Sequence, residues 1–272
     1  MVNTKLILVE GLPGSGKSTT AQLINEILKE RNIPSILFLE GDLDHPADYD
    51  AVSYFTKEQF ENLIEEFPDV RHQLEKHAVA RLEGVIIPQR LLYEIPDALT
   101  QVLSQHDIYE LPMDLHIQLL TDNWQRFCNE ALNANETYIL ECCFIQNPVT
   151  IGMIKYGLPD KIVIQYIQQL AKIIEPLNPM LIYVDQADIR KSFLKAYHER
   201  SKAWADFFIS YYTEQEYGKQ IHAEGLEGTL EVLEARQKLE KNIYEQLKMN
   251  KTTLDNSDFS LDEYKKKIAS LF

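Results

Sequence analysis

Residues 11–18 read Gly-Leu-Pro-Gly-Ser-Gly-Lys-Ser, a pattern of spaced glycines followed by a lysine and a hydroxyl residue. Glycine adopts backbone conformations that a Cβ obstructs, so such a loop can wrap around phosphate oxygens with its N–H groups turned inward. The lysine adds a point charge, and the serine hydroxyl is placed to bind Mg²⁺. We therefore predict a nucleotide phosphate site with Ser18 as a metal ligand. Its residues are Gly11, Pro13, Gly14, Ser15, Gly16, Lys17, Ser18 and Thr19.

The segments on either side of this loop are suited to hold it. Residues 5–9 form a short, continuously apolar run, which is typical of a buried parallel strand. From residue 18 to about residue 31, apolar residues recur on one helical face, and Pro34 closes the segment. The positive end of that helix dipole would face the bound phosphates.

This strand, loop and helix resemble those of the P-loop NTPases. The ending Gly-Ser-Gly-Lys-Ser-Thr is similar to that of the nucleoside, nucleotide and small-molecule kinases of that superfamily. The resemblance implies an α/β, three-layer P-loop fold with a roughly five-stranded parallel sheet in the order 2-3-1-4-5. It also implies ATP and Mg²⁺ as cofactors, although the choice between ATP and GTP stays open. G proteins and ABC ATPases are disfavoured, because the sequence has neither an NKxD motif nor an LSGGQ-like segment.

The rest of the chain continues the alternation of strands and helices that predicts a parallel sheet. Further strands are expected at residues 35–39, 137–140, 180–184 and 250–254, and helices at 188–208 and 225–248. Thr56 with Gln59 and Ser260 with Glu263 have capping-box spacing. We expect a single domain over 1–272, with a helical insertion or substrate lobe at 45–136. Within that lobe only helices are expected, over 70–93, 97–110 and 113–133, and 186–224 is a possible lid.

Acidic residues follow the second and third expected strands. The carboxyl ends of parallel strands surround the ligand crevice, which would place Glu40, Asp42, Asp44 and Glu141 beside the glycine loop. In the kinases that the chain resembles, an acidic residue after the second strand orients the acceptor hydroxyl. Asp42 or Glu40 occupies that place, and we prefer Asp42. Glu141 stands where a Walker B acid would contact Mg²⁺, directly or through water.

The segment from Asp185 to Lys202 contains five lysine and arginine side chains, Arg190, Lys191, Lys195, Arg200 and Lys202. It resembles the arginine-bearing lid of nucleotide kinases, and Arg190 and Arg200 are the candidates for stabilising charge on the transferred group. An exposed helix with paired charges is the alternative. The chain departs from the nucleotide-kinase pattern after the third strand, where Glu141-Cys-Cys-Phe144 stands in place of Asp-Arg-Tyr or Glu-Arg-Ser. The aromatic residues between 204 and 212 are interpreted as core.

The chain of 272 residues carries 27 basic and 42 acidic side chains, a formal charge of −15. This excess disfavours a broad nucleic-acid interface and adhesion to an anionic membrane, and it favours an uncharged or cationic acceptor. The amino-terminal apolar run is too short for a signal peptide or a bilayer span. Three cysteines without CxxC spacing suit a reducing compartment, which predicts a cytoplasmic protein.

These features lead to one main expectation and two alternatives. The main one is an ATP- and Mg²⁺-dependent kinase, a phosphotransferase that acts on a hydroxyl of a small molecule. One alternative is a regulatory P-loop ATPase or nucleotide switch that binds a protein partner through the helical lobe. The other is a nucleoside or nucleotide kinase. The identity of the acceptor and the oligomeric state stay open.

Overall fold

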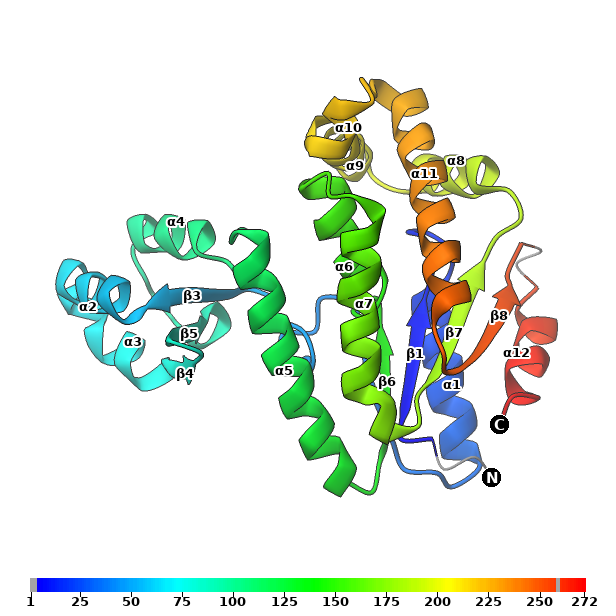
Figure 1. The fold of residues 1–272 in the computed structure, drawn as a ribbon, viewed down its shortest axis with the longest axis horizontal. Helices are drawn as coiled ribbons and strands as arrows, with labels where there is room; N and C mark the ends of the chain where they lie inside the picture. Colours follow the sequence, from blue (N-terminus) through cyan, green and yellow to red (C-terminus); the bar gives the residue numbers. More distant parts are fainter. Residues whose placement is uncertain (1–3, 258–259) are drawn as a thin grey trace. The chain divides into compact units, whose positions relative to one another are not determined.

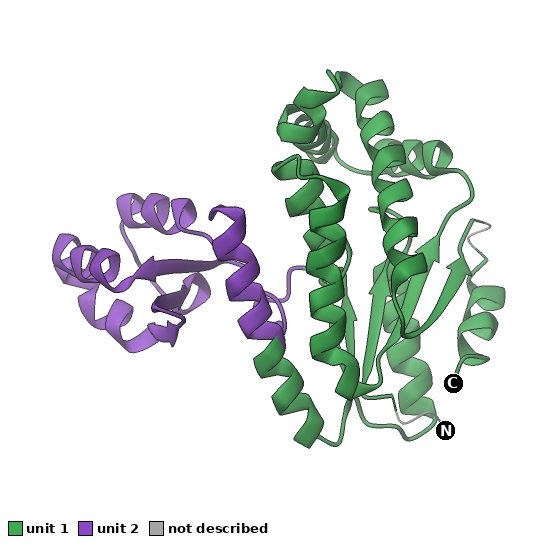
Figure 2. Cartoon of the chain, viewed as in Figure 1, with its two compact units in different colours: residues 1–40, 125–272 green, residues 41–124 purple. Residues whose placement is uncertain are grey.

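The structure, a computed structural model, describes residues 4–257 and 260–272. The chain divides into two compact units, one of residues 1–40 and 125–272 and the other of residues 41–124 (Figure 2). The division passes through helix α5, Met113–Asn133. Among the described residues, no helix combines the length and the apolar character needed to cross a membrane.

The first unit is built on a parallel five-stranded sheet with the order β2-β6-β1-β7-β8 (Figure 1). Val9 of the central strand is in register with Glu141 on one side and with Ile182 on the other. The carboxyl ends of β1 and β6 therefore lie level to within one residue, and β7 continues two residues beyond the end of β1. The strands are β1 Leu6–Glu10, β2 Ser35–Phe38, β6 Thr137–Glu141, β7 Met180–Asp185 and β8 Asn250–Asp255.

Helices cover both faces of this sheet. Ile7, Val9 and Ile182 pack with α1 and α12 on one face. On the other face, Tyr183 donates a hydrogen bond from its hydroxyl to Glu240 of α11, with α7 beside that helix (Figure 1). Because both faces are buried, β1 is apolar at four consecutive positions.

The helices of the first unit lie mostly after β6. They are α1 Lys17–Glu30, α6 Gln146–Val149, α7 Asp160–Ile174, α8 Ile189–Glu199, α9 Lys202–Glu214, α10 Glu216–Gln220, α11 Gly225–Gln246 and α12 Leu261–Ala269. A π-helical turn, Thr150–Lys155, a 3₁₀ turn, Glu175–Leu177, and the part of α5 from residue 125 onward also belong to this unit. The five expected strands and the helix after the glycine loop are thus confirmed, within one or two residues at their ends.

The expectation of a single helix over 188–208 is wrong. The chain instead forms α8 and α9, with a break at Arg200 and Ser201. Both of these residues are extended, and the Ser201 hydroxyl accepts a hydrogen bond from the backbone N–H of Trp204. A serine that caps a new helix favours a turn over a continued helix, and apolar periodicity does not reveal such a break.

The second unit corrects the expectation of an all-helical lobe. It contains a three-stranded antiparallel sheet, β3-β5-β4, formed by Val52–Thr56, Gly84–Pro88 and Val79–Arg81. A Cβ on Gly84 would lie 2.2 Å from the Phe55 carbonyl oxygen, so the close pairing of β5 with β3 requires glycine. The helices of this unit are α2 Lys57–Glu66, α3 Arg71–His77, α4 Asp97–Gln105 and the first part of α5, with 3₁₀ turns at Pro68–Val70 and Gln89–Leu91.

One of the two expected capping boxes forms. At the start of α2, the Thr56 hydroxyl accepts from the Gln59 N–H, and the Gln59 side chain accepts from the Thr56 N–H. Ser260 is the N-cap residue of α12, but its side chain makes no capping hydrogen bond, so the second expected box is wrong. The spacing identifies both helix starts, whereas the reciprocal bonds also require the right side-chain rotamers.

Candidate functional site

The glycine loop joins the carboxyl end of β1 to the amino end of α1. Gly11 has a φ of 145°, and a Cβ there would lie 2.4 Å from the Val184 carbonyl oxygen of the adjacent strand β7. Gly16, the N-cap residue of α1, is left-handed with a φ of 96°. A Cβ on Gly16 would lie 2.4 Å from Asn256 Nδ2, which donates to the Ser15 carbonyl at 2.8 Å. The loop is therefore pressed between β7 and the segment after β8.

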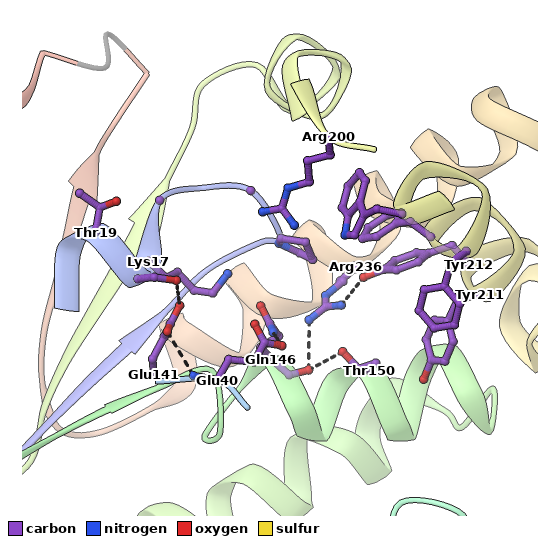
Figure 3. Close-up of a pocket in the computed structure, with 17 residues that line it drawn as sticks. Lys17, Thr19, Glu40, Glu141, Gln146, Thr150, Arg200, Tyr211, Tyr212 and Arg236 are labelled. Atoms are coloured by element: carbon purple, nitrogen blue, oxygen red, sulfur yellow. Dashed lines mark hydrogen bonds between the residues drawn. The ribbon is translucent and has the colours of Figure 1, made fainter. Parts of the chain in front are cut away.

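A pocket of about 440 Å³ opens beside this loop, and all of its lining residues belong to the first unit. Lys17 is buried and lines the pocket (Figure 3). Its Nζ donates to the Leu12 carbonyl oxygen at 2.9 Å. That bond uses one of the three N–H donors of the ammonium group. The loop contributes Pro13, Gly14, Gly16, Lys17, Ser18 and Thr19 to the lining, whereas Gly11 and Ser15 do not line this pocket.

Ser18 and two glutamates form a hydrogen-bonded chain across the pocket floor. The Ser18 hydroxyl donates to Glu141 Oε1 at 2.7 Å, and the backbone N–H of Glu40 donates to Glu141 Oε2 at 3.3 Å (Figure 3). The structure thus brings together three of the residues predicted for the site. They come from α1, from the end of β6 and from the segment after β2.

The donor atoms of this cluster fit a hard divalent cation. Mg²⁺ prefers oxygen ligands, and the Ser18 hydroxyl and the Glu141 carboxylate supply them. Ligand atoms of Glu40, Glu141 and Cys142 lie within 4.8 Å of one another. Burial raises the pKa of the Cys142 thiol well above its ordinary value, which disfavours the thiolate form that binds metals. Ser18 and Glu141, with Glu40 nearby, are thus the residues that could hold Mg²⁺.

The Glu40 carboxylate is oriented by two neighbouring side chains. Gln146 Nε2 donates to Glu40 Oε1 at 2.8 Å, and the Cys142 thiol donates to Glu40 Oε2 at 3.5 Å. Cys142 has a left-handed backbone with a φ of 67°, an uncommon conformation for a residue other than glycine. This turn after β6 places Cys142 and Gln146 on either side of Glu40.

An aromatic wall from α9 borders the same pocket. It consists of Trp204, Phe207, Phe208, Tyr211 and Tyr212. Phe208 and Tyr212 are buried, as expected for core residues, but Phe207 is 69% exposed. The Arg200 guanidinium lies over the Trp204 ring, 4.6 Å from its centroid. The interpretation of this set as core therefore describes only part of its role, because its members also line the pocket.

Two of the predicted catalytic residues, Arg190 and Asp42, are not among the residues that line this pocket. Arg190 is exposed and donates to both carboxylate oxygens of Glu227, at 3.0 and 2.6 Å, and it does not line the pocket. Asp42 belongs to the second unit, where its Oδ1 accepts from the Asp44 N–H at 3.0 Å. In that unit Asp44 forms an ion pair with Arg90. Arg200 is therefore the predicted lid arginine that the structure brings to the pocket.

Sequence reasoning missed several polar residues of the pocket wall, among them Gln146, Thr150, Tyr212 and Arg236. Gln146 and Thr150 follow β6 by a few residues, a position that could have marked them as candidates. Arg236 carried no such signal, because it lies far along α11 with Glu240 four residues later. That spacing is typical of an exposed ion pair on a helix surface.

A buried polar cluster lies directly behind the pocket. Glu10 is fully buried and accepts hydrogen bonds from the backbone N–H groups of Phe144 and Gln146, both at 2.8 Å. Burial raises the pKa of Glu10 to about 8, and the nearby charge of Glu240 adds to the effect. Glu10 is therefore mostly protonated at neutral pH.

Comparison of the chain with protein-family models and with curated protein sequences returns no match. The geometry of the pocket is therefore the basis for inferring its chemistry.

The raised pKa of Glu10 predicts a pH-dependent stability. Between about pH 4.5 and 8 the folded protein binds a proton that the unfolded chain has lost, so this contribution is full below that range and is lost as the pH rises through it. The slope is at most about 1.4 kcal/mol per pH unit. Urea unfolding at pH 5, 7 and 9 should show a smaller loss of stability with rising pH for Glu10→Gln than for the wild type. Equal slopes for the two proteins would contradict the raised pKa.

Proposed function

We propose that this chain is an ATP- and Mg²⁺-dependent phosphotransferase that acts on a hydroxyl of a small molecule. One observation carries the proposal: Lys17 and Ser18 of the glycine loop line one pocket together with the carboxylates of Glu40 and Glu141. Phosphoryl transfer needs charge neutralisation, alignment of the reactants and a carboxylate near the attacking group. The pocket offers a side chain for each of these tasks.

The fold is consistent with the proposal. Counting only the strands of the parallel sheet, the order β2-β6-β1-β7-β8 corresponds to 2-3-1-4-5, the order that the resemblance implies for these kinases. The central strand ends directly at the glycine loop, and α1 begins there. This arrangement supports the assignment of a P-loop fold.

The nucleotide would be held by the loop and by the first turn of α1. Backbone N–H groups at the start of a helix favour anions, and the Lys17 ammonium would neutralise charge on the terminal phosphates. Ser18 and Glu141 would hold Mg²⁺, which would neutralise the charge that develops on the transferred phosphoryl group. Arg200, which stacks on Trp204 and lines the pocket, would contact the nucleotide.

The acceptor would be aligned by Glu40 in this scheme. The acceptor hydroxyl donates its hydrogen bond to the Glu40 carboxylate, which takes the proton as the oxygen bonds to phosphorus and the bond to the ADP oxygen breaks. We assign this role to Glu40 rather than Asp42 because Glu40 lines the pocket with the loop. The carboxylates of Glu40 and Glu141, which line the pocket, favour an acceptor that is uncharged or cationic.

The extent of the pocket favours phosphoryl transfer to a small molecule over the alternative of a nucleotide switch that only hydrolyses ATP. It extends beyond the loop to the aromatic residues of α9 and to the polar side chains of Gln146, Thr150 and Arg236. Pockets that combine apolar walls with a few polar groups are typical of small-molecule sites.

The proposal is tested by incubating the protein with a metabolite extract, Mg²⁺ and ATP labelled with ¹⁸O in the γ-phosphoryl group. Mass spectrometry should detect a product that gains a labelled phosphoryl group. Lys17→Ala should reduce its formation by at least about 100-fold, because the charge on the transferring group is no longer neutralised. ATP hydrolysis without any labelled product would favour the ATPase alternative, and a fully active Lys17→Ala variant would contradict the proposed site.

A second experiment compares Glu40→Gln with Asp42→Asn, two substitutions that remove one charge with little change in shape. Glu40→Gln should lower kcat for the phosphorylated metabolite by about 100-fold or more, because the hydroxyl loses its proton acceptor. Asp42→Asn should leave kcat within about threefold of the wild type, because the Asp42 carboxylate accepts a hydrogen bond from the backbone N–H of Asp44, a local turn contact that an asparagine side chain can also make. The reverse result would return the role to Asp42.

A further inference from the structure

Arg236 of α11 is fully buried and also lines the pocket (Figure 3). Its Nε donates to Glu240 Oε1 at 2.7 Å, and Nη1 donates to the Tyr212 hydroxyl at 2.5 Å. Nη2 donates to the main-chain oxygen of Gln146 at 3.0 Å. Three elements that surround the pocket thus fix the plane of the guanidinium group.

These bonds leave part of the guanidinium unsatisfied. An arginine side chain has five N–H donors, two on each terminal nitrogen and one on Nε. Within residues 4–257 and 260–272, the three bonds above are the hydrogen bonds that Arg236 donates, so each terminal nitrogen keeps one N–H without a protein acceptor. A buried charged donor without an acceptor is costly, and forked N–H groups match the oxygens of a phosphoryl group.

We propose that Arg236 binds an oxyanion in this pocket, with a phosphoryl group as its chemical class. Gln146 connects Arg236 to Glu40, the proposed proton acceptor. Its main-chain oxygen accepts a hydrogen bond from Arg236, and its side chain donates one to Glu40. The inference rests on the proposed function for the source of the anion. That source is the γ-phosphoryl group of the nucleotide or, if the chain is instead the nucleotide kinase that the sequence offers as an alternative, a phosphate carried by the acceptor.

The charges around Arg236 are compatible with a bound anion. Glu240, the acid in contact with the guanidinium, also accepts from the Tyr183 hydroxyl at 2.7 Å and lies in the core. Glu10, which interacts with Glu240, is largely protonated at neutral pH because burial raises its pKa to about 8. Glu240 therefore occupies the core side of the guanidinium, while the pocket side, which Arg236 lines together with Glu40 and Glu141, is left to a ligand.

The alternative is that Arg236 serves only as the partner of Glu240 in a buried ion pair. Two variants separate these roles. Arg236→Lys keeps a positive charge but loses the fork of donors. The double variant Arg236→Gln, Glu240→Gln removes both charges together and so avoids an unpaired buried carboxylate. Arg31→Met, at an exposed arginine that bonds to the Ala269 carbonyl, is the matched control.

Calorimetry should measure the affinity of each variant for Mg²⁺ with AMP-PNP, which carries a γ-phosphoryl group, and for Mg²⁺ with ADP, which lacks one. A second series should measure the rise in melting temperature that inorganic phosphate gives to the ADP-saturated protein. Near-UV circular dichroism should check that each variant is folded. The Arg31→Met control should match the wild type in every measurement.

We expect both Arg236 variants to lose at least about tenfold in affinity for AMP-PNP and less than about twofold for ADP if the nucleotide supplies the anion. If the acceptor supplies the anion, the Arg236 variants should bind both nucleotides as tightly as the wild type does. They should then lose the rise in melting temperature that inorganic phosphate gives to the ADP-saturated protein. Folded variants that keep both would overturn the proposal and leave Arg236 with a structural role. A wild-type protein that binds neither nucleotide would instead refute the proposed function, while stabilisation of the nucleotide-free protein by phosphate would still test Arg236.

Discussion

The hydrogen bond from the Ser18 hydroxyl to Glu141, 2.7 Å long, joins the first turn of α1 to the carboxyl end of β6. Glu141 also accepts a hydrogen bond from the backbone N–H of Glu40, which follows β2. This bond connects the carboxyl end of β6 to the segment after β2. The parallel register of β1 with β6 brings these ends level, so the site follows from the sheet. Any change in that register would separate the serine from both carboxylates.

A second constraint is the polar cluster buried behind the pocket. The ion pair between Arg236 and Glu240 lies in the core, where removing charges from water carries a desolvation cost. Hydrogen bonds from Arg236 to Tyr212 and from Tyr183 to Glu240 offset part of that cost. The same cluster holds the backbone of Gln146, whose N–H donates to Glu10 and whose carbonyl oxygen accepts from Arg236. The side chain of Gln146 in turn donates to Glu40 and orients its carboxylate. The core and the pocket therefore share one network.

The sequence predicts the parallel sheet and the glycine loop well for a physical reason. Strands buried on both faces are continuously apolar, and a loop of spaced glycines has few other interpretations. The antiparallel sheet of the second unit is missed because β4 has three residues and the apolar run of β5, Val85 to Ile87, is also only three residues long, too short to tell a strand from a helix by periodicity. The break at Arg200 and Ser201 is missed because a capping serine interrupts a run whose apolar spacing continues. Arg236 could not be found, since its role depends on burial that spacing alone does not reveal.

The claim that the glycine loop holds a nucleotide together with Mg²⁺ is tested most directly by titrating ATP into the wild type and into Ser18→Ala, each in Mg²⁺ and in EDTA. We predict saturable binding to the wild type with one ATP per chain, weakened by at least about tenfold when EDTA removes the metal. Ser18→Ala, which loses the hydroxyl ligand, should show little difference between the two conditions. Absence of saturable ATP binding, or an equal gain from Mg²⁺ in both proteins, would contradict the account.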